Sequence, residues 1–169
     1  MTGEVALSLA NAELGSAGDL EGWLRGDGAG NENASEVCLR LPEFLDLRAC
    51  IRELLAAAAE RRPLPHDAVE RLNETSARVP RVARLGETGV IQSPAGAGPA
   101  PLVLARVAWS GMELLGGADR GRIRRCDACG RFFVTTRPDR VWCSDRCGNR
   151  VRVARHHARL RDPSYAARG

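Results

Sequence analysis

Apolar residues recur at helical spacing in several segments of the chain. This pattern predicts amphipathic helices over residues 4–14, 42–61, 65–78 and 102–115. The segment 42–61 has the clearest pattern, because Leu47, Ile51 and Leu54 fall on one face and a run of alanines follows them. His66 lies at the start of the predicted helix 65–78. No metal ligand or nucleophile follows it at a spacing typical of a catalytic site, so we interpret it as a helix-start residue.

The segments between these helices have a different period or composition. Residues 15–35 are rich in Gly, Asn and Ser, which predicts a loop that Leu20, Trp23 and Leu24 anchor to the core. Between residues 80 and 93 the pattern changes to that of a β-hairpin with a turn at 86–89. Residues 94–101 are expected to form a second loop, and the glycine-rich segment 116–121 is a candidate hinge.

Four cysteines lie in two closely spaced pairs near the end of the chain. The pairs are Cys126-x2-Cys129 and Cys143-x3-Cys147, separated by 13 residues. Two tight turns at this spacing can direct four thiolates to one tetrahedral metal, so we predict a structural zinc site. Gly130 can adopt the positive φ that such a turn often requires. A strand is expected over 131–134, a turn over 137–139 and a returning strand over 141–143.

A basic helix is predicted after the second pair, with Ser144 as its N-cap. Val151, Ala154 and Ala158 follow Cys147 at helical spacing, which predicts an apolar stripe lying on the hairpin and covering the metal. A second stripe consists of Arg152, Arg155 and Arg159. A turn of the zinc-knuckle type, a hairpin and a helix in that order form a treble-clef arrangement.

The residues Cys147-Gly148-Asn149-Arg150 spell CGNR. Together with Trp142-Cys143-Ser144 before them and the basic helix after them, they closely resemble the CGNR zinc-finger proteins of bacteria. The resemblance implies a C-terminal treble-clef-like finger that is proposed to bind DNA. It also implies a preceding helical and β domain called ABATE, the pair being regarded as stress-related transcription regulators.

Charge divides the chain into two unlike parts. Residues 1–119 contain 11 Arg and 17 acidic residues, a net charge of −6, whereas residues 120–169 contain 14 Arg and 4 acidic residues, a net charge of +10. Such asymmetry is typical of a polyanion-binding segment attached to a domain with another task. No membrane-spanning run or secretory leader is evident, so we expect a cytoplasmic protein. In that reducing compartment Cys38 and Cys50 are expected to be buried free thiols.

These patterns predict an α+β protein with two domains. Residues 1–118 are expected to form a mainly helical, ABATE-like domain with a β-hairpin, and residues 119–169 a small treble-clef-like zinc finger with a basic C-terminal helix. The predicted cofactor is one structural Zn²⁺ on Cys126, Cys129, Cys143 and Cys147. A catalytic role is not expected, because four cysteines saturate the zinc and the hairpin contains no histidine.

The predicted function is DNA-binding transcription regulation, with an arginine-rich helix presented to duplex DNA. The candidate nucleic-acid-binding residues are Asn149, Arg150, Arg152, Arg155, Arg159, Arg137 and Arg140. Asn149 is the candidate for reading adenine, and the arginines would meet phosphates or guanine edges. The alternative is a zinc-stabilised module whose arginines bind RNA or an acidic protein without sequence-specific DNA binding. An arginine-rich helix can also be simply a solvated face, and the sequence does not specify the oligomeric state.

Overall fold

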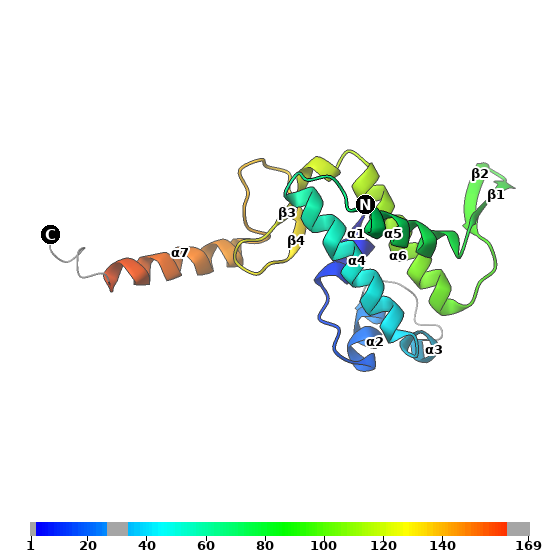
Figure 1. The fold of residues 1–169 in the computed structure, drawn as a ribbon, viewed down its shortest axis with the longest axis horizontal. Coiled ribbons are helices and arrows are strands. Elements are labelled where there is room, and N and C mark those ends of the chain that lie inside the picture. The colour runs from blue at the N-terminus through cyan, green and yellow to red at the C-terminus, as the bar shows by residue number, and fades with distance from the viewer. Residues whose placement is uncertain (1–2, 27–33, 162–169) are drawn as a thin grey trace.

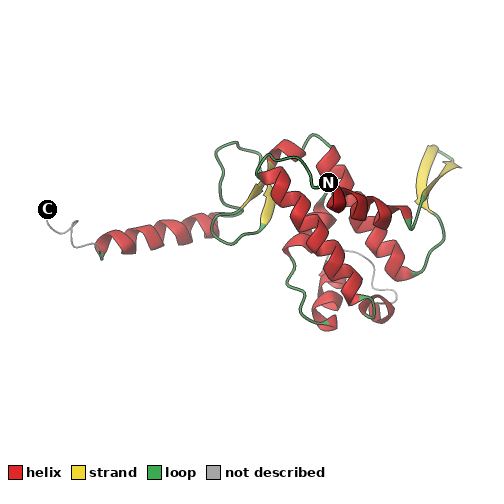
Figure 2. Cartoon of the chain, in the orientation of Figure 1, coloured by secondary structure: helices red, strands yellow, loops and turns green. Residues whose placement is uncertain are grey.

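The computed structural model describes residues 3–26 and 34–161, which form an elongated, mainly helical molecule (Figures 1 and 2). In chain order the helices and strands are α1 (Glu4–Asn11), α2 (Ala17–Gly26), α3 (Ala34–Cys38), α4 (Leu41–Ala59), α5 (His66–Ala77), β1 (Arg81–Gly86), β2 (Gly89–Pro94), α6 (Pro99–Gly116), the 3₁₀ turn η1 (Arg120–Arg122), β3 (Ile123–Arg125), β4 (Phe132–Val134) and α7 (Asp145–Leu160). No helix among these residues has the length and apolar character needed to cross a bilayer.

The core lies where α1, α4, α5 and α6 pack against one another. Helix α4 buries the predicted stripe of Leu47, Ile51 and Leu54, and α6 is apolar enough to be covered on most of its circumference. The predicted helices over 42–61, 65–78 and 102–115 are therefore confirmed, with α6 beginning three residues earlier than expected. The first predicted helix, 4–14, ends at Asn11.

The prediction of a loop over residues 15–35 is wrong for the part that the structure describes. Residues 17–26 form α2, and α3 begins at Ala34, whereas residues 27–33 lie outside the described part. The expected anchoring is confirmed, because Leu20, Trp23 and Leu24 are all buried. Burial of these three side chains on one face stabilises a helix that its glycines disfavour.

The fold class is the predicted one, but the strand pairing of the finger differs from the expectation. Strand β4 pairs antiparallel with β3, which precedes the first cysteine pair, with Ile123 opposite Val134. Residues 141–143, expected as the returning strand, form an irregular bend instead. The Arg140 guanidinium donates hydrogen bonds to the carbonyls of Trp142 and Cys143, so a side chain takes the place of a strand partner there.

The β3–β4 hairpin is docked on the helical body and shares its core. Ile123 and Phe132 are buried in the same cluster as the residues of α1 and α4. The Asn11 side chain pairs with Phe132 in both directions: its amide donates to the Phe132 carbonyl and its carbonyl oxygen accepts from the Phe132 N–H, each at 2.8 Å. The candidate hinge at 116–121 is thus followed at once by a segment that is packed against the helices.

The two ends of the molecule are the β1–β2 hairpin and α7. They project in opposite directions from the helical body (Figure 1). The expected β-hairpin at 80–93 is confirmed, with its turn at residues 86–89. Neither projecting element contributes to the core described above.

Candidate metal centre and basic helix

The first cysteine pair lies in the turn that connects β3 to β4. The Gly130 N–H donates to the Cys126 carbonyl at 2.8 Å, and the Cys126 N–H donates to the Arg131 carbonyl at 2.8 Å, which closes the turn tightly. Gly130 has φ +71°, the left-handed conformation expected for this position. The turn therefore brings Cys126 and Cys129 to the same side of the backbone.

The second cysteine pair spans the start of α7. Ser144 is the N-cap, as predicted: its backbone is extended and its hydroxyl accepts from the Cys147 N–H at 3.3 Å. Cys147 consequently lies in the first turn of the helix. Cys143 lies on the bend just before the cap, so the start of the helix positions both sulfurs.

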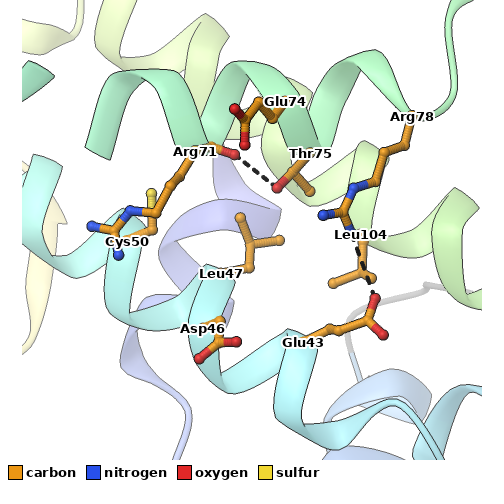
Figure 3. Close-up of a pocket in the computed structure, with 9 residues that line it drawn as sticks. All are labelled: Glu43, Asp46, Leu47, Cys50, Arg71, Glu74, Thr75, Arg78 and Leu104. Atoms are coloured by element: carbon orange, nitrogen blue, oxygen red, sulfur yellow. Dashed lines mark hydrogen bonds and ion pairs between the residues drawn. The ribbon is translucent and has the colours of Figure 1, made fainter. Parts of the chain in front are cut away.

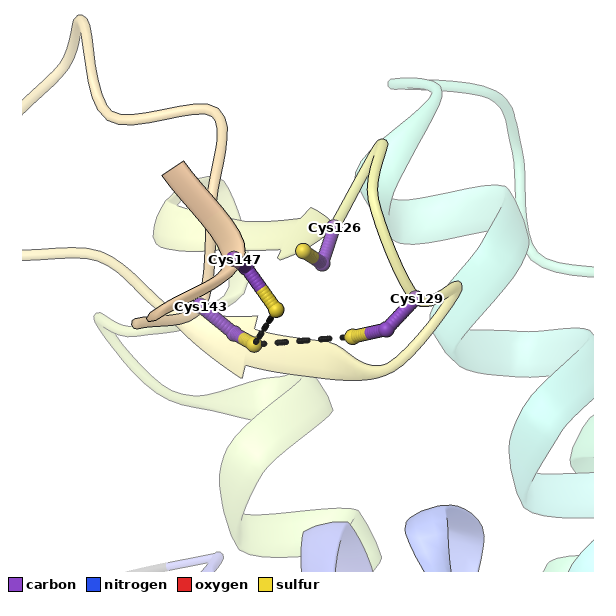
Figure 4. A group of neighbouring side chains, drawn as sticks. All are labelled: Cys126, Cys129, Cys143 and Cys147. Carbon is purple, nitrogen blue, oxygen red and sulfur yellow. Dashed lines mark hydrogen bonds between the residues drawn. The ribbon is translucent and has the colours of Figure 1, made fainter. Parts of the chain in front are cut away.

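The four sulfurs converge on one point (Figure 4). All of them lie within 4.8 Å of one another, with Cys129 and Cys143 3.6 Å apart and Cys143 and Cys147 3.7 Å apart. A tetrahedral zinc with bonds of about 2.3 Å requires sulfurs separated by about 3.8 Å. The observed separations fit this ion, and its four coordination positions are all supplied by the protein. One structural Zn²⁺ is therefore the cofactor of this site.

The electrostatics of the cluster favour a bound cation. Burial disfavours the charged form of Cys126, but backbone N–H groups of Cys143, Ala128 and Cys129 donate to its sulfur and lower its pKa to about 6. For Cys143, burial and hydrogen bonds with the other three thiols raise the pKa to about 12. The protein alone thus stabilises one thiolate and opposes the next. A divalent ion at this site would offset that opposition, because a thiol that coordinates a metal loses its proton.

Two arginines and a tryptophan hold the loops around the metal ligands. Arg140 donates to the Trp142 and Cys143 carbonyls at 2.8 and 2.9 Å, and Arg150 on α7 donates to the Ala128 carbonyl between the first two cysteines. The Trp142 ring packs on Gly148, where an added Cβ would lie 3.1 Å from a ring carbon. Gly148 is therefore needed for the close approach of ring and helix.

The predicted apolar stripe along α7 covers the finger only at its beginning. Cys147 and Val151 are half-buried, whereas Ala154 and Ala158 are exposed, so the expectation for them is wrong. The cause is geometric, because the helix runs away from the short hairpin and from the rest of the described chain (Figure 1). From residue 152 to 159 every side chain of α7 is exposed.

The predicted nucleic-acid-binding residues lie at one end of the molecule, but only some of their side chains form hydrogen bonds within the protein. Arg140 and Arg150 donate to backbone carbonyls of the metal-ligand loops, and both residues are nevertheless exposed. Arg152 donates to the Asn149 side-chain carbonyl, which orients that amide on the helix surface. This contact leaves the Asn149 NH₂ group available as a donor.

Arg155, Arg159 and Arg137 are exposed. Within the described part of the chain their side chains form no ion pair or hydrogen bond. At 100° per residue, Asn149, Arg152, Arg155 and Arg159 fall within about a third of the helix circumference. The helix contains five arginines and one aspartate, a net charge of +4 with neutral histidines.

A cleft of about 180 Å³ lies between α4 and α5 (Figure 3). Leu47, Cys50 and Leu104 form its apolar floor, and charged side chains surround its mouth. The arginines at the mouth are already paired, Arg78 with Glu43 at 3.6 Å and Arg71 with Glu53 at 2.8 Å. The cleft is smaller than pockets that enclose organic ligands, about 300–1,000 Å³, so we assign no ligand to it. Cys50 is buried as predicted, whereas Cys38 is only partly buried, so the prediction of a buried thiol there is wrong.

Comparison with known protein families agrees with this architecture. A family model described as "Putative stress-induced transcription regulator", ABATE, matches residues 3–118. The chain belongs to the ABATE family. A second model, the CGNR zinc finger, matches residues 122–160 of this ABATE protein and includes all four cysteines. Both families are of regulator and zinc-finger type rather than enzymes. A search of curated proteins found no relative of this ABATE chain.

Sequence reasoning missed Asn11, which connects the helical body of the ABATE protein to its finger. The residue is 121 positions away from Phe132. It falls in the last turn of the helix predicted over 4–14, where an Asn is ordinarily exposed to solvent. Nothing in its neighbourhood in the sequence distinguishes it. The same holds for the packing of Trp142 on Gly148, although the glycine was part of the CGNR motif.

Proposed function

We propose that this ABATE protein is a DNA-binding transcription regulator whose structural zinc holds α7 in position for contact with duplex DNA. The observation that carries the proposal is the combination of anchoring and exposure in this helix. Its first turn is tied to the metal through Cys147, and its remaining length presents a column of arginines to solvent. A rigidly based, positively charged helix has the shape and charge that suit the major groove.

The residues divide into two groups in this proposal. Arg155, Arg159 and Arg137 contact phosphates, because their guanidinium groups have no competing partner within the described residues. Asn149, oriented by Arg152, faces a base, with adenine as the best match for its amide. Arg140 and Arg150 contribute positive charge to the surface while they hold the loops around the metal.

The proposal includes two expectations from the sequence. The chain is divided into an ABATE unit, residues 1–118, and a finger unit, residues 119–169, which is supported by the separate family matches on the two sides of this boundary. The protein acts in the cytoplasm, where thiolates stay reduced and can bind zinc. No catalytic step is included, since the four cysteines leave zinc without an open position.

Replacement of Arg155 with alanine tests the proposed interface. Binding to a DNA duplex is measured by fluorescence anisotropy at several salt concentrations, and enrichment from randomised duplexes identifies a preferred sequence. Loss of one phosphate contact makes the plot of log K against log salt shallower, with the magnitude of its negative slope reduced by about 0.9. The matched control is Arg84→Ala, which removes an exposed arginine of β1 and should leave the slope unchanged, since β1 lies at the opposite end of the molecule from α7 (Figure 1).

Three outcomes would contradict parts of this proposal. Equal affinity and slope for the Arg155→Ala variant and the unchanged protein would exclude this arginine from the interface. Equal effects of Arg155→Ala and Arg84→Ala would mean that only net charge matters. Binding without any sequence enrichment, and lost as salt rises, would favour an RNA or an acidic protein as the partner of α7 instead.

A further inference from the structure

The β1–β2 hairpin exposes an unusual amount of apolar surface. Leu85 is 86% exposed, Val90 69% and Ile91 53%, and Val82 is also exposed. Most of this two-stranded ribbon is open to solvent, since nine of its twelve residues are exposed and only Gly86, Gly89 and Ser93 are partly buried. A two-stranded hairpin is marginal by itself and is ordinarily stabilised by further strands or a covering helix. The exposed apolar residues therefore indicate a surface that another element covers.

The base of the hairpin is fixed to the helical body, so its projecting part has a defined orientation. The Arg81 guanidinium lies 4.1 Å from the centre of the Trp109 ring on α6 and 3.9 Å from the Glu113 carboxylate. The Ala95 N–H donates to the Pro80 carbonyl at 2.8 Å, which closes the ladder below the strands. The hairpin is thus presented as a small preformed sheet with two open edges.

The two edges differ in charge. Strand β1 carries Arg81 and Arg84, whereas β2 has the uncharged sequence Gly-Val-Ile-Gln-Ser-Pro. Edge strands are commonly protected from pairing with other chains by charged side chains or bulges. Strand β2 lacks charge along its length, and its proline is at the end, so residues 89–93 have a free edge that a second strand can extend.

The register of the hairpin determines which groups point outward from β2. The turn contains two residues, so Gly86 and Gly89 form a hydrogen-bonded pair. From there, hydrogen-bonded and non-hydrogen-bonded pairs alternate along the two strands. Ile91 is consequently bonded inward to Arg84. The N–H and C=O groups of Val90 and Gln92 point away from β1 and have no partner in the hairpin.

We propose that β2 pairs antiparallel with β2 of a second copy of this chain, about a two-fold axis at Ile91. This register places Val90 opposite Gln92 of the other copy and satisfies the outward groups of both residues in both chains. The two Ile91 side chains then face each other as a non-hydrogen-bonded pair, the closer kind of cross-strand contact. The result is a four-stranded sheet in which the arginines of β1 lie on the outer strands.

Pairing through β1 would be less favourable for an electrostatic reason. Its outward groups belong to Arg81, Ala83 and Leu85, and an antiparallel pair about Arg84 brings the Arg84 side chains of the two copies together at the seam. Like charges on adjacent strands oppose association. The uncharged edge of β2 therefore makes a second copy of the same strand a suitable partner, since pairing brings no charge into the seam.

Two proline variants of the full zinc-loaded chain test the proposal. Gln92→Pro removes an N–H that points outward from β2, and Ala83→Pro removes an outward N–H from β1, so neither interrupts the hairpin's own ladder. Sedimentation over a range of concentrations should show a dimer that Gln92→Pro weakens by about tenfold or more, from lost hydrogen bonds, and that Ala83→Pro leaves intact. Unchanged circular dichroism and zinc content establish that each variant is folded.

The proposal is overturned by a chain that is monomeric at every concentration, by a dimer that Gln92→Pro does not weaken, or by one that only Ala83→Pro weakens. Cross-linking provides an independent readout of the register. In Ile91→Cys the two introduced thiols face each other within disulfide reach, whereas in Leu85→Cys they are separated by both β2 strands. We expect a disulfide-linked dimer from the first variant alone, and equal cross-linking of both would refute the register. These measurements require no DNA, so their outcome is independent of the proposed function.

Discussion

Replacement of Asn11 with alanine tests how firmly the zinc finger is held on the helical body. The Asn11 amide forms two hydrogen bonds of 2.8 Å with the N–H and C=O of Phe132, at a half-buried position between α1 and β4. The Phe132 side chain is itself buried in the shared core. Alanine removes both bonds and leaves two backbone groups without their partners.

The magnitude follows from the two lost hydrogen bonds. Each contributes about 0.5–1.5 kcal/mol net, and a polar group left without a partner adds a penalty that partial access to water reduces. We expect Asn11→Ala to lower the free energy of unfolding by about 2–3 kcal/mol. At the Phe132 amide, 2 kcal/mol corresponds to about 30-fold faster hydrogen exchange, because each 1.4 kcal/mol is a factor of ten.

The assay combines denaturant unfolding, followed by tryptophan fluorescence, with amide hydrogen exchange. Asn73→Ala is the matched control, because Asn73 is exposed on α5 and its replacement should change stability by less than about 0.5 kcal/mol. Faster exchange at Phe132 with unchanged global stability would show that the finger undocks separately from the helices. A variant that matches the control in both measurements would refute the role given to Asn11.

Three further substitutions test the metal centre. Cys129→Ser should lose the zinc in native mass spectrometry and reduce helical circular dichroism, because α7 has little packing of its own; one full zinc per chain would exclude Cys129 as a ligand. Gly148→Ala places a Cβ 3.1 Å from the Trp142 ring. This substitution should lower the free energy of unfolding by about 1–3 kcal/mol and alter the tryptophan emission. An unchanged emission spectrum and an unchanged stability would contradict the packing of Trp142 on Gly148. Ser144→Ala removes the N-cap and should cost about 1 kcal/mol in denaturant unfolding, a loss that Ser144→Asp should not show.

The sequence alone was sufficient for features that depend on residues close together in the chain. The four ligands, the turn at Gly130 and the cap at Ser144 are each specified within a few residues, so spacing and residue type predicted them. Helices α1, α4, α5 and α6 follow from periodicity for the same reason, whereas α2 and α3 were not predicted. The charge difference between the two parts of the chain is likewise a property of composition.

Tertiary structure decided which distant segments meet. Strand β4 pairs with β3 and not with residues 141–143, because Ile123 and Phe132 are buried against helices far away in the sequence. The hydrogen bond from Asn11 to Phe132 likewise joins segments that are distant in the sequence. The predicted apolar stripe on α7 is exposed because no other element packs against that part of the helix in the described structure. An apolar pattern indicates that a face can be buried, but only the arrangement of the other elements determines whether anything covers it.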